Sequence, residues 1–260
     1  MSKNVAVVMG DIHGRADQLE LMIKEVRSRF GYDVDIYSTG DLIDRGPDSK
    51  GVIDICIKEG IKANFGNHDQ WLFEFCFRQV FDPSCLLPGM AGTATLSSYG
   101  VGWRSFYQKY PDDKEVYKAI ANTLWKKIPE DHKAFFLSME PYRKVWVGDD
   151  EEIYWLIHAG LKEPIARKYK AQGLSDDEMM EKMPVNNLLW PFPKIGRDER
   201  EGVDLYQFEE GTQILGHTVC KVPIIGEGYI AIDTGCGTKA PYTLSAIVLP
   251  TMEIIQVRQP

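Results

Sequence analysis

The sequence predicts an α/β protein with a parallel sheet covered by helices and a second sheet further along the chain. Over the first 65 residues, apolar stretches of strand length alternate with helical patterns, as in parallel sheets. Strand-like stretches rich in β-branched residues return after residue 143. Five short motifs, GDIHG, GDLIDRG, GNHD, HAG and GHT, contain four of the five histidines.

The N-terminal elements are predicted in the order strand, helix, strand, helix, strand. An apolar run at 4–9 precedes a helical pattern over 15–30. A strand over 33–39, a helix over 48–59 and a strand over 61–65 follow. The first three motifs begin where these strands end, which is where open α/β sheets place their ligands.

The pattern changes between residues 70 and 149, where prolines and glycines break the chain. Helices are expected near 115–127 and 130–139, and we expect one domain over 1–260 with an insertion or cap at about 80–142 near the site. Later strands are expected at 143–147, 153–157, 212–215, 229–232, 244–249 and 253–257. The stretch 163–210 is polar, with one helix predicted at 176–183.

Composition and charge exclude several classes of function. A chain that is 44% hydrophobic and 26% charged has material for a buried core. The net charge of −8 argues against binding to nucleic acid or to an anionic membrane. Because the first apolar run is too short for a signal sequence or a membrane span, we expect a cytoplasmic protein. The five cysteines form no CxxC pair and are expected to be reduced and mostly buried.

The motifs supply a ligand set for two divalent cations. Asp11 and His13 lie two residues apart and can share one metal ion, while the carboxylate of Asp41 can bridge two ions. An amide and two imidazoles complete the shell of the second ion: Asn67, His158 and His217. Nitrogen and oxygen ligands without cysteine suit Mn²⁺, Fe or Zn²⁺, and we take manganese first.

Such a pair of cations activates a water molecule for attack on a phosphoryl group. His68, beside a predicted ligand, is placed to act as the general acid for the departing alkoxide. Asp44 is expected to orient His68 and to favour its charged form. Arg45 is expected to bind phosphate through its planar fork of donors.

In this order, the five motifs resemble the signature of the phosphoprotein phosphatase branch of the calcineurin-like metallophosphoesterase superfamily, including its small bacterial and phage members. The resemblance spans residues 10–218. It implies a four-layer α/β/β/α sandwich of two mixed sheets flanked by helices. It also implies the six metal ligands, and the roles of His68, Asp44 and Arg45, given above.

Two features depart from that pattern. The family carries a second phosphate-binding arginine soon after a tryptophan, whereas here Trp190 is followed by PFPKIG before Arg197 and Arg200. Neither arginine aligns cleanly, and Arg197 is the candidate for this contact. The segment IDTGCG at 232–237 resembles bacterial members, which leaves the substrate open.

Three functions are weighed. The first is a phosphatase acting on phosphoserine or phosphothreonine in a protein or peptide, because Asp44 stands beside Arg45. The second is a dinucleoside tetraphosphate hydrolase, with the insertion covering a nucleotide. The third is a scaffold that binds phosphorylated partners without hydrolysis, which the complete ligand set disfavours. Phosphotyrosine and small phosphate esters are further possible substrates.

Other polar and apolar residues are expected to be structural. His132 is predicted to be a solvated helix residue among charged neighbours, and Asp69 to be the N-cap of a helix that begins at Gln70. Two groups are predicted to pack in the interior: Trp103, Phe106, Tyr107 and Tyr110 in the insertion, and Met179, Met180 and Met183.

Overall fold

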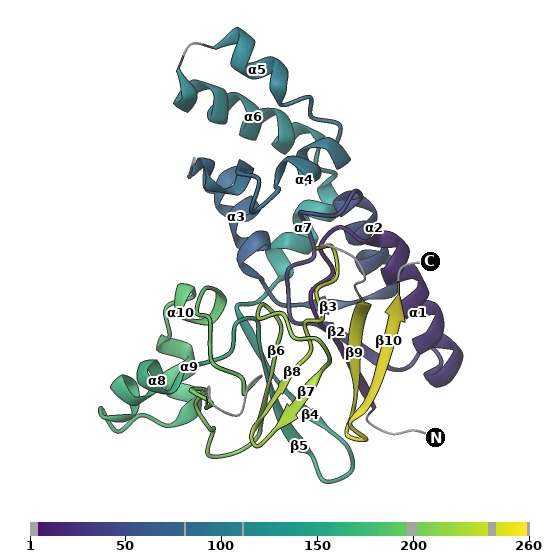
Figure 1. The fold of residues 1–260 in the computed structure, drawn as a ribbon, viewed down its shortest axis with the longest axis vertical. Coiled ribbons are helices and arrows are strands. Elements are labelled where there is room, and N and C mark those ends of the chain that lie inside the picture. Colours follow the sequence, from purple (N-terminus) through teal and green to yellow (C-terminus); the bar gives the residue numbers. More distant parts are fainter. Residues whose placement is uncertain (1–4, 81, 111, 197–201, 239–242, 259–260) are drawn as a thin grey trace.

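The computed structural model describes residues 5–80, 82–110, 112–196, 202–238 and 243–258, which form two five-stranded sheets flanked by helices (Figure 1). The first sheet has the order β10-β9-β1-β2-β3: Glu253–Arg258, Thr243–Leu249, Ala6–Met9, Asp35–Ser38 and Lys62–Ala63. The second has the order β4-β5-β6-β8-β7: Tyr142–Val147, Glu152–Ile157, Thr212–Leu215, Tyr229–Ala231 and Ile224–Gly226. As predicted, β1, β2 and β3 are parallel to one another. Strand β9 pairs antiparallel with both β1 and β10. The second sheet combines both directions too, so both sheets are mixed.

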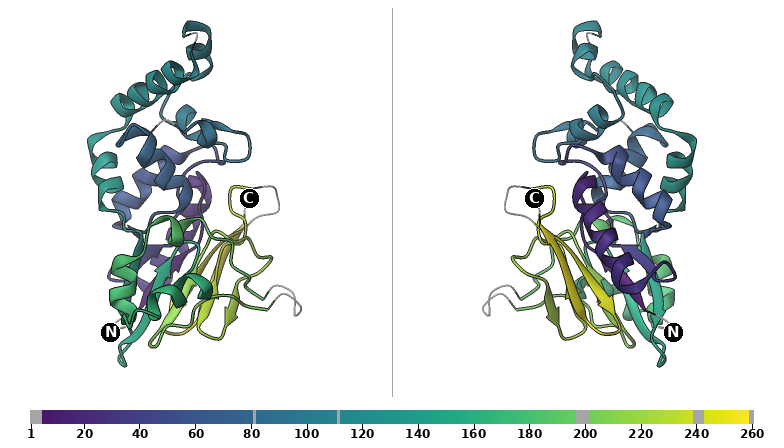
Figure 2. Two further views of the ribbon diagram at one scale, coloured as in Figure 1. Left: turned by 90° about the vertical axis from the view of Figure 1, so that its left-hand side faces the viewer. Right: turned by 90° about the vertical axis from the view of Figure 1, so that its right-hand side faces the viewer.

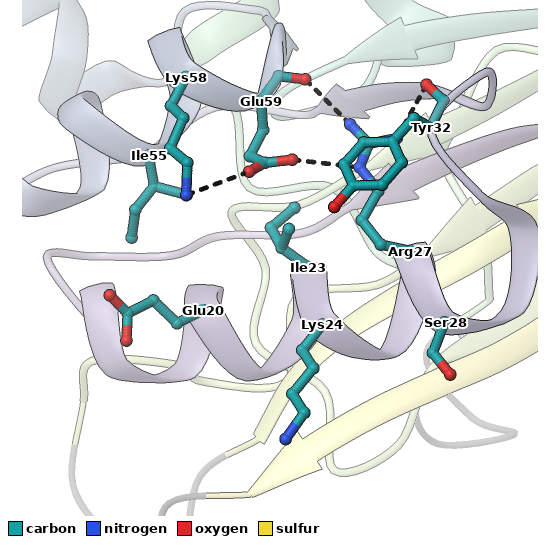
Figure 3. Close-up of a pocket in the computed structure, with 9 residues that line it drawn as sticks. All are labelled: Glu20, Ile23, Lys24, Arg27, Ser28, Tyr32, Ile55, Lys58 and Glu59. Atoms are coloured by element: carbon teal, nitrogen blue, oxygen red, sulfur yellow. Dashed lines mark hydrogen bonds and ion pairs between the residues drawn. The ribbon is translucent and has the colours of Figure 1, made fainter.

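Strand β1 is apolar and buried at every position, as expected for a central strand that is covered on both faces. Ala6 and Val8 belong to the apolar cluster between the two sheets, while Val7 and Met9 point into the cluster on the other face. Two helices cover this outer face: α1 (Ala16–Phe30) and α2 (Ser49–Glu59). Arg27 of α1 joins them, since its guanidinium donates to the carboxylate and the carbonyl of Glu59 at 3.1 and 3.0 Å (Figure 3).

The outer face of the second sheet is covered by three helices: α8 (Glu163–Lys170), α9 (Asp176–Lys182) and α10 (Asn186–Leu189). Trp155 and Ile157 of β5 pack there with the three methionines predicted to be buried: Met179, Met180 and Met183. This confirms the four-layer arrangement. The prediction of a single helix in 163–210 is wrong, because α8 and α10 are too short for helical periodicity to be recognised in the sequence.

The predicted helical insertion lies between β3 and β4 in sequence and projects from the two sheets as a lobe (Figures 1 and 2). It follows α3 (Asn67–Cys76) and contains five further helices: η1 (Pro83–Leu86), α4 (Thr93–Ser98), α5 (Arg104–Lys109), α6 (Asp113–Lys127) and α7 (Glu130–Ser138). Trp103, Phe106 and Tyr110 pack partly buried against the core as predicted, whereas Tyr107 is 42% exposed. Helices α5 and α6 lie farthest from the sheets.

His132 is buried, so the prediction of a solvated residue is wrong. Its Nδ1 lies 2.8 Å from the hydroxyl of Tyr99, at the end of α4, and its Nε2 lies 2.8 Å from a carboxylate oxygen of Asp54 in α2. Phe136 and the charged neighbour Lys133 are buried on the same helix, so α7 turns this part of its surface inward despite the charges around His132 in sequence. His132 therefore ties the insertion to the helix that follows the GDLIDRG motif.

All five cysteines are buried free thiols, as predicted. Burial raises the pKa of the Cys56, Cys76 and Cys236 thiols well above the ordinary value, and that of Cys85 to about 12. Among the described helices, none combines the length and the apolar character needed to cross a bilayer.

We predict that His132→Ala lowers the free energy of unfolding by about 2–3 kcal/mol, because it leaves the buried Tyr99 hydroxyl without a partner and opens a cavity. Urea denaturation measures the change. Leu137→Ala, at a 65% exposed position of the same helix, is the control and should change stability much less. Equal effects of the two substitutions would show that the His132 contacts contribute nothing specific.

Candidate metal and phosphate site

The five motifs meet at one end of the two sheets. Asp11 and His13 follow β1, Asp41 follows β2, and Asn67 opens α3 just after β3. In the second sheet, His158 follows β5 directly and His217 follows β6. Because these strands are parallel within each sheet, their carboxyl ends share an edge, and the packing of the sheets brings the two edges together.

The backbone is strained at several motif residues. His13, Asp41 and His217 have φ angles of 47°, 54° and 59°, in the left-handed region that residues with a Cβ rarely occupy. Asp44 and Arg45 have φ angles of 68° and 65°. Such conformations cost of order 1–3 kcal/mol each and persist where the surrounding structure enforces them, commonly at functional sites.

Two glycines allow backbone N–H groups to reach the predicted carboxylate ligands. A Cβ on Gly66 would overlap the carboxylate of Asp41, and a Cβ on Gly216 would overlap that of Asp11. The residues after these glycines use the space: His68 N donates to Asp41 Oδ1 at 3.0 Å, and His217 N donates to Asp11 Oδ1 at 3.1 Å. The GNHD and GHT loops therefore hold the two carboxylates in place.

Asp41 lies at the centre of the cluster. Its Oδ2 is 3.5 Å from His13 Nε2 and 3.5 Å from His158 Nε2, which belong to different sheets. Asp11 Oδ2 is 3.8 Å from His13 Nε2. His13 Nδ1 lies 3.0 Å from the carbonyl oxygen of Ile43, which places the proton on Nδ1 and directs the Nε2 lone pair at the carboxylates.

The second half of the cluster is formed by an amide oxygen and two imidazoles. Asn67 Oδ1 lies 3.1 Å from His158 Nε2 and 3.0 Å from His217 Nδ1, and these two nitrogens are 3.2 Å apart. His158 Nδ1 faces the carbonyl of Thr39 at 3.2 Å, so its Nε2 carries a lone pair. His217 Nε2 is buried and has no hydrogen-bond partner among the residues that the structure describes. Asn67 Oδ1, His158 Nε2 and His217 Nδ1 all offer lone pairs, and there are too few protons for hydrogen bonds between all of them. A divalent cation, which binds such nitrogen and oxygen atoms, fits this arrangement.

Burial sets the protonation of these ligands. It lowers the pKa of His13 and of His158, and it lowers the pKa of His217 to about 3, which favours neutral imidazoles. Burial alone would raise the pKa of Asp41, but the positive charge of nearby imidazoles, which His68 carries most readily, brings it below the ordinary value and keeps that carboxylate ionised. Burial raises the pKa of Asp11, and neighbouring carboxylates raise it further.

His68 and Asp44 form a buried pair beside the cluster. His68 Nδ1 lies 2.8 Å from Asp44 Oδ2, and both residues are 3% exposed or less. Burial lowers the pKa of His68, but the charges of Asp41 and Asp44 and the hydrogen bond to Asp44 outweigh this and raise its pKa above the ordinary value. The orientation leaves His68 Nε2 facing the site.

Arg45 extends across the site. Its Nη1 lies 2.7 Å from His13 Nε2 and its Nη2 lies 3.1 Å from His68 Nε2. Arg45 therefore donates to two imidazole nitrogens that the predicted chemistry needs. For His13 to bind a cation through Nε2, the guanidinium must turn away, and its donors then become available to another acceptor.

Two acidic residues near the site make contacts that were not predicted from the motifs. Asp69 is the third residue of α3 and not an N-cap, so that prediction is wrong; its carboxylate accepts from the N–H groups of Gly66 and Leu42 and joins two motif loops. Asp233 of IDTGCG is buried near Asp11 and accepts from Gly235 N at 2.8 Å. Burial raises the pKa of Asp233 to about 6.

Aromatic residues line one side of the site. The Phe192 ring lies 4.4 Å from the His217 ring and is 69% exposed. Trp190 packs against Trp71, and its indole donates to Gln70 at 2.9 Å. The predicted phosphate ligand Arg197 lies outside the described residues. The groove drawn in Figure 3 is lined by α1, α2 and Tyr32, and no motif residue takes part in it.

Comparison with known proteins agrees with this geometry. The sequence profile of the calcineurin-like phosphoesterase family matches residues 5–219. Serine/threonine-protein phosphatase 1 of Salmonella typhimurium is 43% identical over 63 residues, 24% of this chain and only 29% of that relative. An asymmetrical bis(5'-nucleosyl)-tetraphosphatase of Oceanobacillus iheyensis is 24% identical over 272 aligned residues, 97% of this chain and 92% of that protein.

Solved structures show the same fold. A crystal structure provisionally named a diadenosine tetraphosphatase superposes with a TM-score of 0.61 at 18% identity, covering 99% of this chain and 95% of the other. A metallophosphoesterase from Sphaerobacter thermophilus gives a TM-score of 0.50 at 13% identity, covering 99% and 89%. At these identities the likeness concerns the arrangement of sheets and helices.

We predict that Asp41→Asn weakens Mn²⁺ binding by more than about 100-fold. Removing a residue that only hydrogen-bonds to a metal ligand costs up to about 100-fold in affinity, and loss of a ligand itself should cost more. Isothermal titration calorimetry measures the affinity. In the unchanged protein, Mn²⁺ at 100 times its dissociation constant should stabilise the fold by about 2.7 kcal/mol for each occupied site. The exposed Asp35→Asn is the control, and an Asp41→Asn protein that binds Mn²⁺ normally would remove Asp41 from the ligand set.

Proposed function

Because this chain belongs to the calcineurin-like phosphoesterase family, we propose that it removes phosphate from phosphoserine and phosphothreonine in proteins or peptides. It is a hydrolase of phosphoric ester bonds, in keeping with the family and with the relatives named above. The observation that carries the finer proposal is the buried Asp44–His68 pair. A proton donor held in this way matters most when the group that departs is strongly basic.

The proposed ligands of one cation are Asp11, His13 and Asp41, and those of the other are Asp41, Asn67, His158 and His217. Cations held by these residues would lower the pKa of bound water and neutralise charge on phosphoryl oxygens. Manganese is the first candidate, with iron or zinc as alternatives. Thr39 and Ile43 support the imidazoles through their carbonyl oxygens and keep the ligating nitrogens unprotonated.

His68 acts as the general acid in this proposal. Asp44 holds its Nδ1 proton, so the second proton sits on Nε2, on the side that faces the substrate. Arg45 and a protonated His68 Nε2 are both donors and cannot share their present contact. Binding of a phosphate dianion resolves this conflict, because the Arg45 fork moves its donors to phosphate oxygens. His68 then gives its proton to the leaving oxygen.

The chemistry of the leaving group favours a serine or threonine ester. The alkoxide of either side chain is strongly basic and needs protonation as the P–O bond breaks. A nucleoside polyphosphate departs as a weakly basic phosphate and gains less from an acid. A buried and oriented acid therefore supports the phosphomonoesterase over the anhydride hydrolase.

A second candidate is hydrolysis of dinucleoside tetraphosphates, favoured by Phe192. This exposed ring lies against His217 at the edge of the proposed metal site. Exposed aromatic rings stack nucleobases, and each such stack is worth about 1–3 kcal/mol. The tetraphosphatase relative that aligns over most of this chain supports the same candidate function.

We predict that His68→Asn lowers kcat on a phosphothreonine peptide by about 10² to 10⁴, the usual contribution of a general acid, and leaves metal binding intact. Steady-state kinetics in Mn²⁺ measure the loss, and calorimetry verifies the bound metal. An unchanged rate on this substrate, whose leaving group is poor, would exclude His68 as the acid.

We also predict a higher kcat/KM for a phosphothreonine peptide than for diadenosine tetraphosphate, both measured with Mn²⁺. The reverse preference would make the tetraphosphatase the better assignment. Phe192→Ala tests the same point: if the ring binds a base, KM for the dinucleotide rises about tenfold with little change for the peptide. Tyr32→Ala, which removes an 80% exposed ring in the groove of Figure 3, is the matched control.

A further inference from the structure

We propose that Thr95, in helix α4 of the insertion, is a positioning residue for the proton donor His68. The inference rests on the proposed role of His68 as general acid. Thr95 touches neither the metal cluster nor His68, and it acts through Asp44. It would make the insertion part of the machinery for proton transfer.

Thr95 and Asp44 share two hydrogen bonds. The Thr95 hydroxyl donates to Asp44 Oδ1 at 2.5 Å, and Asp44 N donates back to Thr95 Oγ1 at 3.0 Å. Thr95 is 1% exposed and Asp44 is 3% exposed, so bulk water has little access to these bonds. Ser49 Oγ lies 2.9 Å from Thr95 Oγ1 and also accepts from Asp44 N at 3.1 Å.

The distribution of protons fixes the direction of these bonds. A hydroxyl has one proton to donate, and Asp44 Oδ1 is an acceptor only, so the Thr95 proton lies on that bond. Asp44 Oδ2 is then left for His68 Nδ1 at 2.8 Å. Each carboxylate oxygen has its own donor from a different element, and this fixes the plane of the carboxylate. The plane of the carboxylate in turn orients the imidazole ring.

The backbone at Asp44 gives a second reason for such a restraint. Its φ angle of 68° is unfavourable for an aspartate and needs surrounding contacts to persist. Thr95 and Ser49 supply them, since both accept from the Asp44 N–H group. Without Thr95, the buried carboxylate loses one of its two side-chain donors, and Asp44 is free to rotate away from His68.

Helix α4 is itself anchored to the segment that follows Asp44. Ser98 Oγ accepts from Lys50 N at 2.7 Å at the start of α2. Tyr99, just after α4, bonds to His132, which bonds to Asp54 farther along α2. The position of Thr95 is therefore set by the same helix that begins next to the GDLIDRG loop.

The test compares kcat on two substrates that differ in leaving group: a phosphothreonine peptide and p-nitrophenyl phosphate, whose phenolate departs without help from an acid. We expect Thr95→Val to lower kcat on the peptide about tenfold, as the loss of one bond to a charged group predicts. On p-nitrophenyl phosphate the loss should be less than about twofold. Thr95→Ser keeps the hydroxyl and should restore the peptide rate. Ser97→Ala removes an exposed hydroxyl of the same helix, which bonds to the Thr93 carbonyl within that helix, and should change neither rate.

A purely structural Thr95 would lower both rates equally, or would leave both unchanged, and either result overturns the inference. Failure of Thr95→Ser to restore the peptide rate overturns it as well. If Thr95→Val does not fold by circular dichroism, Thr95→Cys, with its weaker donor, takes its place with the same expected difference between substrates. His68→Asn is measured beside them: if it shows no dependence on the leaving group, the proposed function fails, whereas a dependence for His68→Asn alone overturns only the role of Thr95.

Discussion

The site is organised around the Asp41 carboxylate, which is buried and shared by two groups of imidazoles from different sheets. A buried charge without compensation is costly, so this position requires cationic or hydrogen-bonding partners on every side. One oxygen accepts the His68 N–H group, and the other faces His13 and His158. These demands explain why the surrounding loops adopt backbone conformations that they would otherwise avoid.

The sandwich makes this convergence possible. His13 and His158 come from different sheets, and they meet because the apolar residues between the sheets hold the two edges in register. Asn64 adds a directional link, since its side-chain amide donates to the carbonyl of Leu156 at 2.7 Å, two residues before His158. The distance between the proposed metal ligands thus depends on residues that bear no chemistry themselves.

The sequence was sufficient to predict the parts of the molecule that depend on local pattern. Strand–helix alternation, the buried methionines of α9 and the convergence of the motifs all follow from periodicity and from where strands end. The sequence was insufficient where tertiary contacts determine the environment of a residue. His132 has charged neighbours in sequence but is buried by the packing of α7 on α2, and Asp69 joins two loops that lie 24 residues or more apart in the chain. The strand β7 and the helices α8 and α10 are too short for their periodicity to be recognised in the sequence.

Hydrolysis of a phosphate ester by the proposed mechanism requires both metal binding and protonation of the leaving group, and different parts of the fold hold the residues proposed for each. The cluster around Asp41 belongs to the two sheets, whereas His68, the proposed proton donor beside it, contacts Asp44, which in turn bonds to a helix of the insertion. A change in the insertion can therefore alter how well a leaving group is protonated without changing the six proposed metal ligands. Helix α4 of the insertion bonds to Asp44 through Thr95 and to the start of α2 through Ser98, so the insertion is coupled to the group proposed to complete hydrolysis.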